Sequence, residues 1–257
     1  MEINSKINPS KVQLAINCGG ESLKSSNGIT YVADSYYSGG QTSGFARGEE
    51  IKHTNDQEVY YTERWSKEDL TYTIPIKGEG SFVLILQFSE VYFSSKGEKV
   101  FDVEVNGIKV LESFDIFEKV GKNAAYDEFI KISVSGRKLK VNDKPTDFDG
   151  NNLDIKLVKK EKDNPKINGI VLVKGTFDDT HYKEFMDSLE FQEKMKLEKE
   201  RKSREFQRMS KSIDYEDFED DFVDDGRFNL RGNGLFSFKG FAFFGVVAFM
   251  LYFLFSL

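Results

Sequence analysis

Residues 81–107 read SFVLILQFSEVYFSSKGEKVFDVEVNG, and this stretch decides the fold that we expect. Its first part, residues 82–86, is a continuous apolar run, which is typical of a strand covered on both faces. Residues 101–105 alternate apolar and charged side chains, which predicts a strand with one face in water. The dipeptide Asn106-Gly107 favours a tight hairpin directly after it, because both residues tolerate positive φ.

Two adjacent aromatic residues, Tyr92 and Phe93, open the loop that follows the apolar run. Large aromatic side chains in a loop reduce solubility unless they fold back onto the core or bind a ligand. The pair is therefore the first indication of a binding function.

Strand-like segments recur from residue 12 to residue 173, separated by turn signals rich in Gly, Pro and Asn. We expect about eight or nine short strands, a long irregular loop region over residues 22–50, and no helix before Tyr182. This pattern predicts an all-β fold, a β-sandwich or a jelly roll, for residues 11–182.

The composition argues against several classes of protein. The 257 residues carry a formal net charge of −7, whereas nucleic-acid-binding proteins usually present a basic patch. The single cysteine, Cys18, excludes an internal disulfide framework and a cysteine-based zinc site. The only histidines, His53 and His181, are far apart in the sequence, so we expect surface or loop histidines rather than a metal centre. We expect no cofactor and no catalytic residue.

The composition changes after Tyr182. Residues 183–212 are highly charged and predict a helical stalk, and residues 214–225 hold eight acidic side chains. Residues 240–257 form an uncharged apolar run, which predicts a C-terminal membrane anchor over residues 235–257. The expected order is an N-terminal tail (1–10), a β domain (11–182), a charged stalk with an acidic linker (183–234) and the anchor. No signal peptide is recognisable at the N-terminus.

Five blocks of sequence resemble the malectin family in the same order: AINCGGE at 15–21, YYTERW at 60–65, FSEVYF at 88–93, KVFDVEVNG at 99–107 and DNPKINGIVLVKGT at 163–176. The family comprises membrane-anchored lectins of the endoplasmic reticulum. The resemblance implies a non-catalytic lectin domain in the lumen that binds glucose-containing oligosaccharides, notably diglucosylated high-mannose N-glycans. It also implies a role in early glycoprotein quality control near the oligosaccharide transfer machinery.

The resemblance also implies which residues bind the sugar. They are Tyr92, Phe93, Asp163 and Trp65, which stands where the animal proteins commonly have tyrosine. A further family tyrosine is absent, and Phe45 is its suggested replacement. These residue types suit a pyranose, because aromatic rings cover its C–H face and a carboxylate accepts hydrogen bonds from its hydroxyls.

Two other functions remain open from the residues alone. A glycoside hydrolase needs two carboxylates, and acids occur at Glu63, Glu90, Asp102 and Asp163, although only Asp163 falls in the expected site.

The second alternative is a tail-anchored interaction protein that faces the cytosol. Arg227, Arg231 and Lys239 precede the anchor and no basic residue follows it, which favours a cytosolic location for that side. The lectin hypothesis instead predicts a signal segment upstream of Met1.

Overall fold

The computed structural model of the protein describes residues 7–212. The first six residues, the acidic segment and the predicted anchor at 235–257 lie outside the described residues. Within 7–212, no helix has both the length and the apolar character needed to cross a bilayer.

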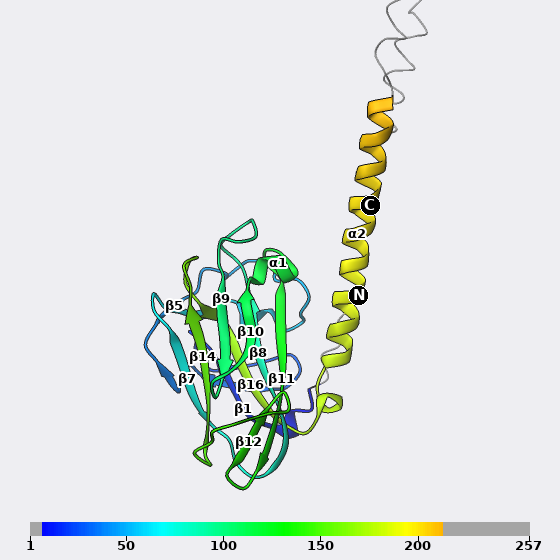
Figure 1. Ribbon diagram of the computed structural model, residues 1–257. Coiled ribbons are helices and arrows are strands. Elements are labelled where there is room, and N and C mark those ends of the chain that lie inside the picture. The colour runs from blue at the N-terminus through cyan, green and yellow to red at the C-terminus, as the bar shows by residue number, and fades with distance from the viewer. Residues whose placement is uncertain (1–6, 213–257) are drawn as a thin grey trace, which may run out of the picture. The chain divides into compact units, whose positions relative to one another are not determined.

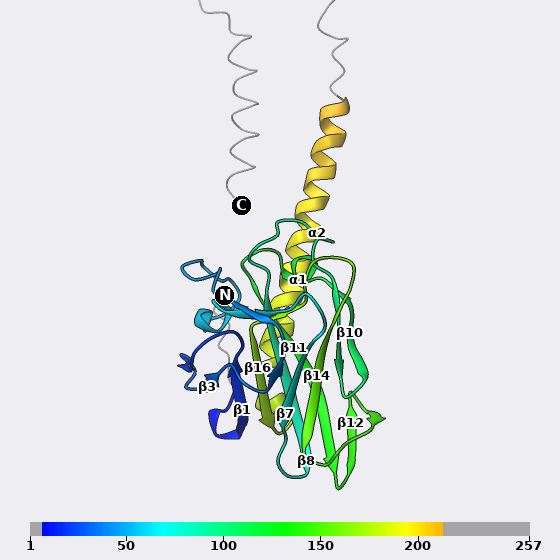
Figure 2. The same cartoon turned by 90° about the vertical axis from the view of Figure 1, so that its left-hand side faces the viewer.

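Two β-sheets packed face to face form the framework of the fold (Figure 1). The larger sheet has eight strands in the order β13 (Lys144–Thr146), β12 (Lys138–Val141), β11 (Ala125–Ser135), β8 (Gly80–Ser89), β16 (Gly169–Lys174), β1 (Val12–Asn17), β3 (Thr30–Ala33) and β2 (Leu23–Lys24). The smaller sheet has five, in the order β10 (Ile108–Phe114), β9 (Phe101–Val105), β14 (Asn152–Lys159), β7 (Leu70–Pro75) and β4 (Tyr37–Ser38). Figure 2 shows the two layers from the side. The prediction of an all-β sandwich is confirmed.

A third, three-stranded sheet consists of β15 (Lys166–Ile167), β6 (Glu63–Trp65) and β5 (Gln41–Ser43). Its central strand, β6, is antiparallel to both neighbours, and Trp65 lies opposite Lys166 on one side and Gln41 on the other. This small sheet positions several of the candidate site residues.

Strand β8 is buried on both faces, as the apolar run at 82–86 predicts. Residues 82–89 are all buried. On the inner face, Phe88 contacts Phe101 of β9 and Phe114 of β10, with ring centroids 6.1 and 5.1 Å apart. Gln87 points the opposite way and bonds Tyr31 and Tyr60 above the outer face. Successive side chains of a strand point to opposite faces of the sheet, so residues on both faces of β8 must pack against other parts of the protein.

The hairpin after β9 is confirmed, because Asn106 and Gly107 have φ values of 46° and 76°. The expected wet face of β9 is only partly correct. Asp102 is buried, and its carboxylate forms ion pairs with Lys109 at 2.9 Å and Lys160 at 2.7 Å. Lys109 of β10 and Lys160, which directly follows β14, thus compensate the charge of Asp102, which the alternating pattern alone would place in water.

Several short elements were not predicted. The described residues contain sixteen strands rather than eight or nine, and residues 22–50 include four of them, β2 to β5. One helical turn and a half, α1 (Ile116–Val120), begins after Asp115, whose side chain accepts a hydrogen bond from the Glu118 amide. Three 3₁₀ turns complete the set: η1 (Pro9–Lys11), η2 (Gln57–Tyr60) and η3 (Phe177–Asp179). Elements of two to five residues are too short to show a periodicity.

The charged helix is present as α2 (Tyr182–Ser212). Near its start Phe185 is buried against Phe129 and Tyr126 of β11, with ring centroids 5.6 and 5.8 Å apart. Within the described chain, residues 7–201 belong to one compact unit and residues 202–212 to another.

His181 lies in the turn before α2, as expected for a loop histidine, but the alternative of a surface position is wrong. His181 is buried, and its Nε2 lies 2.9 Å from Oδ2 of Asp127. The other Asp127 oxygen accepts a hydrogen bond of 2.6 Å from the hydroxyl of Tyr60. Burial and the nearby Asp127 raise the pKa of Tyr60 well above its usual value. His53 is half-buried in a turn, with φ of 65°.

Candidate functional site

A hollow of about 450 Å³ at one end of the sandwich brings together all five of the residues singled out in the sequence. We call it the aromatic pocket. Ten residues line it: Ser43, Phe45, Glu63, Trp65, Val91, Tyr92, Phe93, Lys99, Asp163 and Asn164. Its volume falls within the range of ordinary small-ligand sites.

Strand β6 contributes two of these side chains by simple alternation. Glu63 and Trp65 project from one face of the strand into the aromatic pocket. Arg64 projects from the other face, is buried, and bonds Asp34 at 2.6 Å. Thr62 is also buried and donates to the side chain of Asn17 at 3.0 Å. The TERW motif therefore alternates between fixing the strand and lining the pocket.

The aromatic pair at the end of β8 is held by a buried carboxylate. Glu90 is only 1% exposed, and its Oε1 accepts hydrogen bonds from the amides of Tyr92 at 2.8 Å and Phe93 at 3.1 Å. The two rings meet edge to face with centroids 5.1 Å apart. Tyr92 remains 64% exposed, so the loop presents its ring to solvent instead of returning it to the core.

Phe45 approaches the same pair from the loop after β5. Its ring centroid lies 5.6 Å from that of Tyr92, in an edge-to-face contact, and the side chain is 60% exposed. Three neighbouring aromatic rings, two of them largely exposed, therefore form one wall of the pocket.

Asp163 reaches the pocket from the turn before β15. Its backbone has φ of 35°, a region that Asn and Asp enter more readily than most residues. Oδ2 of Asp163 lies 2.5 Å from Nζ of Lys99. The same Nζ lies 3.4 Å from the backbone oxygen of Asn164 and 5.4 Å from the centroid of the Phe93 ring. One cation thus contacts both the acidic turn and the aromatic loop.

Sequence reasoning missed four polar members of the pocket. Lys99 and Asn164 stand inside blocks quoted for the family resemblance, and Glu63 was considered only as a hydrolytic acid. Ser43 carried no signal, since it lies in a region expected to be irregular.

The four carboxylates considered for hydrolysis are each engaged in hydrogen bonds or ion pairs. Glu90 is buried behind the aromatic loop and bonds backbone amides, and Asp102 is paired with lysines on β10 and beyond β14. Glu63 and Asp163 do share the pocket, but each forms an ion pair with a lysine. That arrangement suits accepting hydrogen bonds better than giving up a proton.

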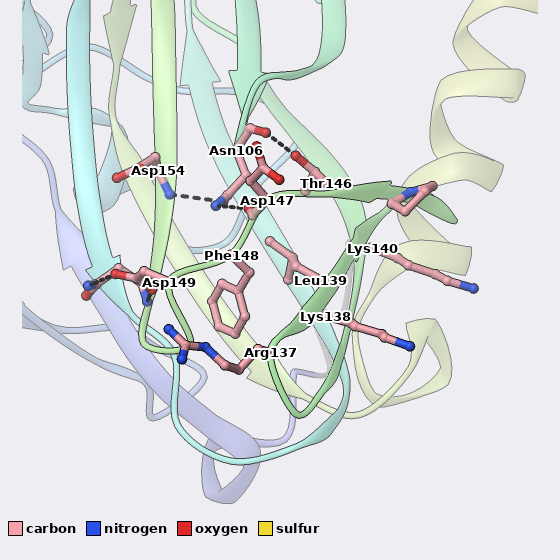
Figure 3. A pocket seen from close by; sticks show the side chains of 12 residues that line it. Asn106, Arg137, Lys138, Leu139, Lys140, Thr146, Asp147, Phe148, Asp149 and Asp154 are labelled. Atoms are coloured by element: carbon pink, nitrogen blue, oxygen red, sulfur yellow. Dashed lines mark hydrogen bonds between the residues drawn. The ribbon is translucent and has the colours of Figure 1, made fainter.

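A larger hollow of about 590 Å³ lies at the other end of the sandwich, around the turns next to β12 (Figure 3). Phe148 is the single aromatic residue in its lining. The side chain of Asn106 bonds the Asp147 oxygen and the Asp154 amide, and Asp149 accepts three hydrogen bonds from Asn151 and Asn152. These polar groups already form hydrogen bonds within turns, so this hollow is the weaker candidate for a ligand site.

The described part of the chain offers neither a cluster of metal ligands nor a reactive thiol. No group of three or more potential ligand side chains within residues 7–212 could hold a metal ion. Cys18 is fully buried, and burial raises the pKa of its thiol, which keeps it in the unreactive protonated form.

Comparison with known proteins identifies the family. A sequence profile described as the malectin domain matches residues 12–170. The chain belongs to the malectin domain family. A malectin domain is a carbohydrate-binding lectin domain, not an enzyme.

Individual malectins agree with this assignment. The chain is 43% identical to Malectin-A of Xenopus laevis over 172 residues, 66% of this chain and 62% of that protein. It is 40% identical to human Malectin over 174 residues, 66% of this chain and 59% of that protein. The chain thus spans about three fifths of the malectins it matches.

A more distant likeness concerns the fold alone. The ANX2 ectodomain from Arabidopsis thaliana superposes with a TM-score of 0.54 at 19% identity, covering 63% of this chain and 49% of that structure. The sandwich is therefore shared with a protein of low sequence similarity.

Proposed function

We propose that this protein is a membrane-anchored lectin that binds glucose-containing oligosaccharides in the aromatic pocket. Its ligands on this proposal are diglucosylated high-mannose N-glycans in the lumen of the endoplasmic reticulum, early in glycoprotein quality control. The family to which the chain belongs and the apolar run at 240–257 support the proposal.

One observation carries the proposal above all others. Trp65, Tyr92, Phe93 and Asp163 come from three separate segments of the chain, and all four line one hollow. Aromatic rings can cover the C–H face of a pyranose at low cost in side-chain entropy. The carboxylate can accept from neighbouring hydroxyls, and hydrogen bonds to charged groups contribute roughly 1.5–3 kcal/mol each.

A glycan-binding screen tests the proposal. The full chain, in buffer free of sugar-based detergents, is compared with Asp163→Asn, which keeps a residue type that tolerates positive φ. We expect selective retention of glucose-capped oligosaccharides by the wild type and its loss in Asp163→Asn. The exposed Asp143, which also has positive φ, supplies the control Asp143→Asn. Retention that is unchanged in Asp163→Asn would contradict the site.

Topology needs a test of its own. Lys24→Asn creates an Asn-x-Ser acceptor sequence that includes Ser26, and Lys24 is exposed on the edge strand β2. For a lumenal domain we expect an increase in mass that endoglycosidase treatment removes. An unmodified variant, beside a lumenal reference protein that is modified, would favour the cytosol-facing alternative.

By family resemblance, the lectin would work near the oligosaccharide transfer machinery. A chain that is anchored in the same membrane would meet nascent glycans there. Co-purification of that machinery with the wild type, and with Asp163→Asn, would distinguish recruitment by protein contact from recruitment by glycan.

A further inference from the structure

Two carboxylates, those of Glu63 and Asp163, line the aromatic pocket, and each is paired with a lysine. Lys99 lies 2.5 Å from Oδ2 of Asp163, and Nζ of Lys166 bonds Oε2 of Glu63. Lys166 is only 1% exposed, so this second pair is part of the interior. The formal charges of the four groups sum to zero.

Each pair leaves one carboxylate oxygen free. Within residues 7–212, Oδ1 of Asp163 and Oε1 of Glu63 make no hydrogen bond or ion pair, while the second oxygen of each holds its lysine. Both side chains line the aromatic pocket. The pocket therefore offers two charged acceptors, each already paired with a lysine: Lys99, which also lines the pocket, and the buried Lys166.

Both the backbone and the side chain of Glu63 are held in place by neighbouring groups. It belongs to β6, the central strand of the three-stranded sheet, and lies opposite Ser43 of β5. Gly19 packs directly against its backbone, since a Cβ at position 19 would lie 2.0 Å from the Glu63 carbonyl oxygen. The strand cannot shift toward Gly19, and Lys166 fixes the end of the side chain.

We infer that Glu63, held by Lys166, is a second hydrogen-bond acceptor for the bound sugar beside Asp163, and that the two acceptors select a neutral hexose over its uronic acid. This inference rests on the proposed function of the pocket. The hydroxyls of a neutral hexose can donate to both free oxygens. The carboxylate of a uronic acid has no proton to donate at neutral pH and would meet the like charges of Glu63 and Asp163, while Lys99 and Lys166 are already paired with these two carboxylates.

Calorimetric titration of the full chain tests the inference with two ligands. One is a glucosyl disaccharide, and the other is its counterpart with glucuronic acid as the terminal residue. We expect the wild type to bind the acidic ligand at least 10-fold more weakly than the neutral one. For Glu63→Gln we expect neutral-ligand affinity to fall by about 10- to 100-fold, as for one hydrogen bond to a charged group.

Selectivity is the readout that a structural role of Glu63 would not change. Because Glu63→Gln removes one of the two negative charges, we expect a smaller ratio of neutral-ligand affinity to acidic-ligand affinity than in the wild type. The control is Glu79→Gln, an exposed glutamate in the turn before β8 outside the pocket lining. Its affinities should match those of the wild type.

Glu63→Gln leaves Lys166 buried without its anion, so the double variant Glu63→Gln/Lys166→Met keeps the test open if the single variant does not fold. If neither variant folds, the inference is judged on the affinities of the wild type for the neutral and the acidic disaccharide. Equal binding of both ligands by the wild type, or unchanged affinity and preference in a folded Glu63 variant, would overturn the inference and leave the proposed function intact. A wild type that binds neither ligand would overturn both.

Discussion

The ammonium group of Lys99 lies 2.5 Å from Oδ2 of Asp163, and this ion pair joins the segment before β9 to the turn before β15. The same ammonium lies 5.4 Å from the ring centroid of Phe93. Lys99 therefore orients an acceptor and an aromatic ring at once, and neither residue faces the pocket independently.

The first prediction concerns this lysine. Lys99→Met keeps most of the apolar stem and removes the charge, so we expect sugar affinity to fall by about 1–2 kcal/mol as Asp163 loses its orientation. Lys99→Arg should restore part of the loss. Lys109→Met, at a lysine paired with Asp102 outside the pocket, is the matched control. Titration with a glucosyl disaccharide measures all three, and equal affinity in Lys99→Met and wild type would rule out the positioning role.

The second prediction separates binding from stability at Tyr92. Because this side chain is 64% exposed, Tyr92→Ala should leave the melting temperature nearly unchanged. The same change should weaken sugar binding by about 1–3 kcal/mol if the ring becomes covered by the ligand. Tyr36→Ala, at another exposed tyrosine outside the pocket lining, is the control for binding. A lower melting temperature without a loss of affinity would assign Tyr92 to the fold instead.

The β-sandwich could be predicted from the sequence, and five residues of the pocket could be proposed from it, but the ion pairs and hydrogen bonds that position them could not. The apolar run at 82–86 and the hairpin at Asn106 depend on local preferences and were predictable. Burial of Asp102 was not, because it depends on Lys160, which is distant in sequence. The same holds for Lys99 and Asp163, whose 64-residue separation gives no sign that they meet.

The burial of His181 could not be predicted from the sequence either. This residue follows the last strand and reads as a loop residue, yet it is buried against Asp127 of β11. Its burial depends on how the start of α2 packs, which no local pattern specifies.

The third prediction concerns Asn168, a fully buried residue between β15 and β16. Its Nδ2 donates to the backbone oxygens of Tyr60 and Thr62, and its Oδ1 accepts from the amide of Ser89. Asn168→Ala leaves these three groups unsatisfied in the interior, so we expect a loss of about 2–4 kcal/mol in the free energy of unfolding.

Urea unfolding of the full chain measures this loss. Asn151→Ala, at an exposed asparagine whose side chain makes no recorded bond in the described chain, should cost less than about 0.5 kcal/mol. Similar effects of the two substitutions would show that the Asn168 network contributes little.

The fourth prediction is a pH dependence at Asp102. Burial alone would raise the pKa of Asp102, but hydrogen bonds from Lys160, Lys109 and the Ser113 amide outweigh it and lower the pKa to about 2. The native state therefore binds this proton less readily than the unfolded state. The stability that Asp102 contributes is present above pH of about 4 and is lost as the pH falls toward 2.

Asp102→Asn should accordingly be about 1–2 kcal/mol less stable than wild type at pH 6. The difference should disappear near pH 2. Urea unfolding between these two values measures it, with Asp143→Asn as a control at an exposed carboxylate. A difference that stays constant over the whole range would mean that the charge of Asp102 is not the cause.

Trp65 offers the most direct test of the central claim that the aromatic pocket binds sugar, because it is the only tryptophan of the 257 residues and lines that pocket. The measurement is its intrinsic fluorescence in the full chain, titrated with a glucosyl disaccharide and, separately, with an acyclic polyol. We predict a saturable change with the disaccharide, no saturable change with the polyol, and no change with either in Asp163→Asn. Disaccharide binding that is measurable by calorimetry but leaves Trp65 fluorescence unchanged, and is equal in Asp163→Asn, would contradict the account.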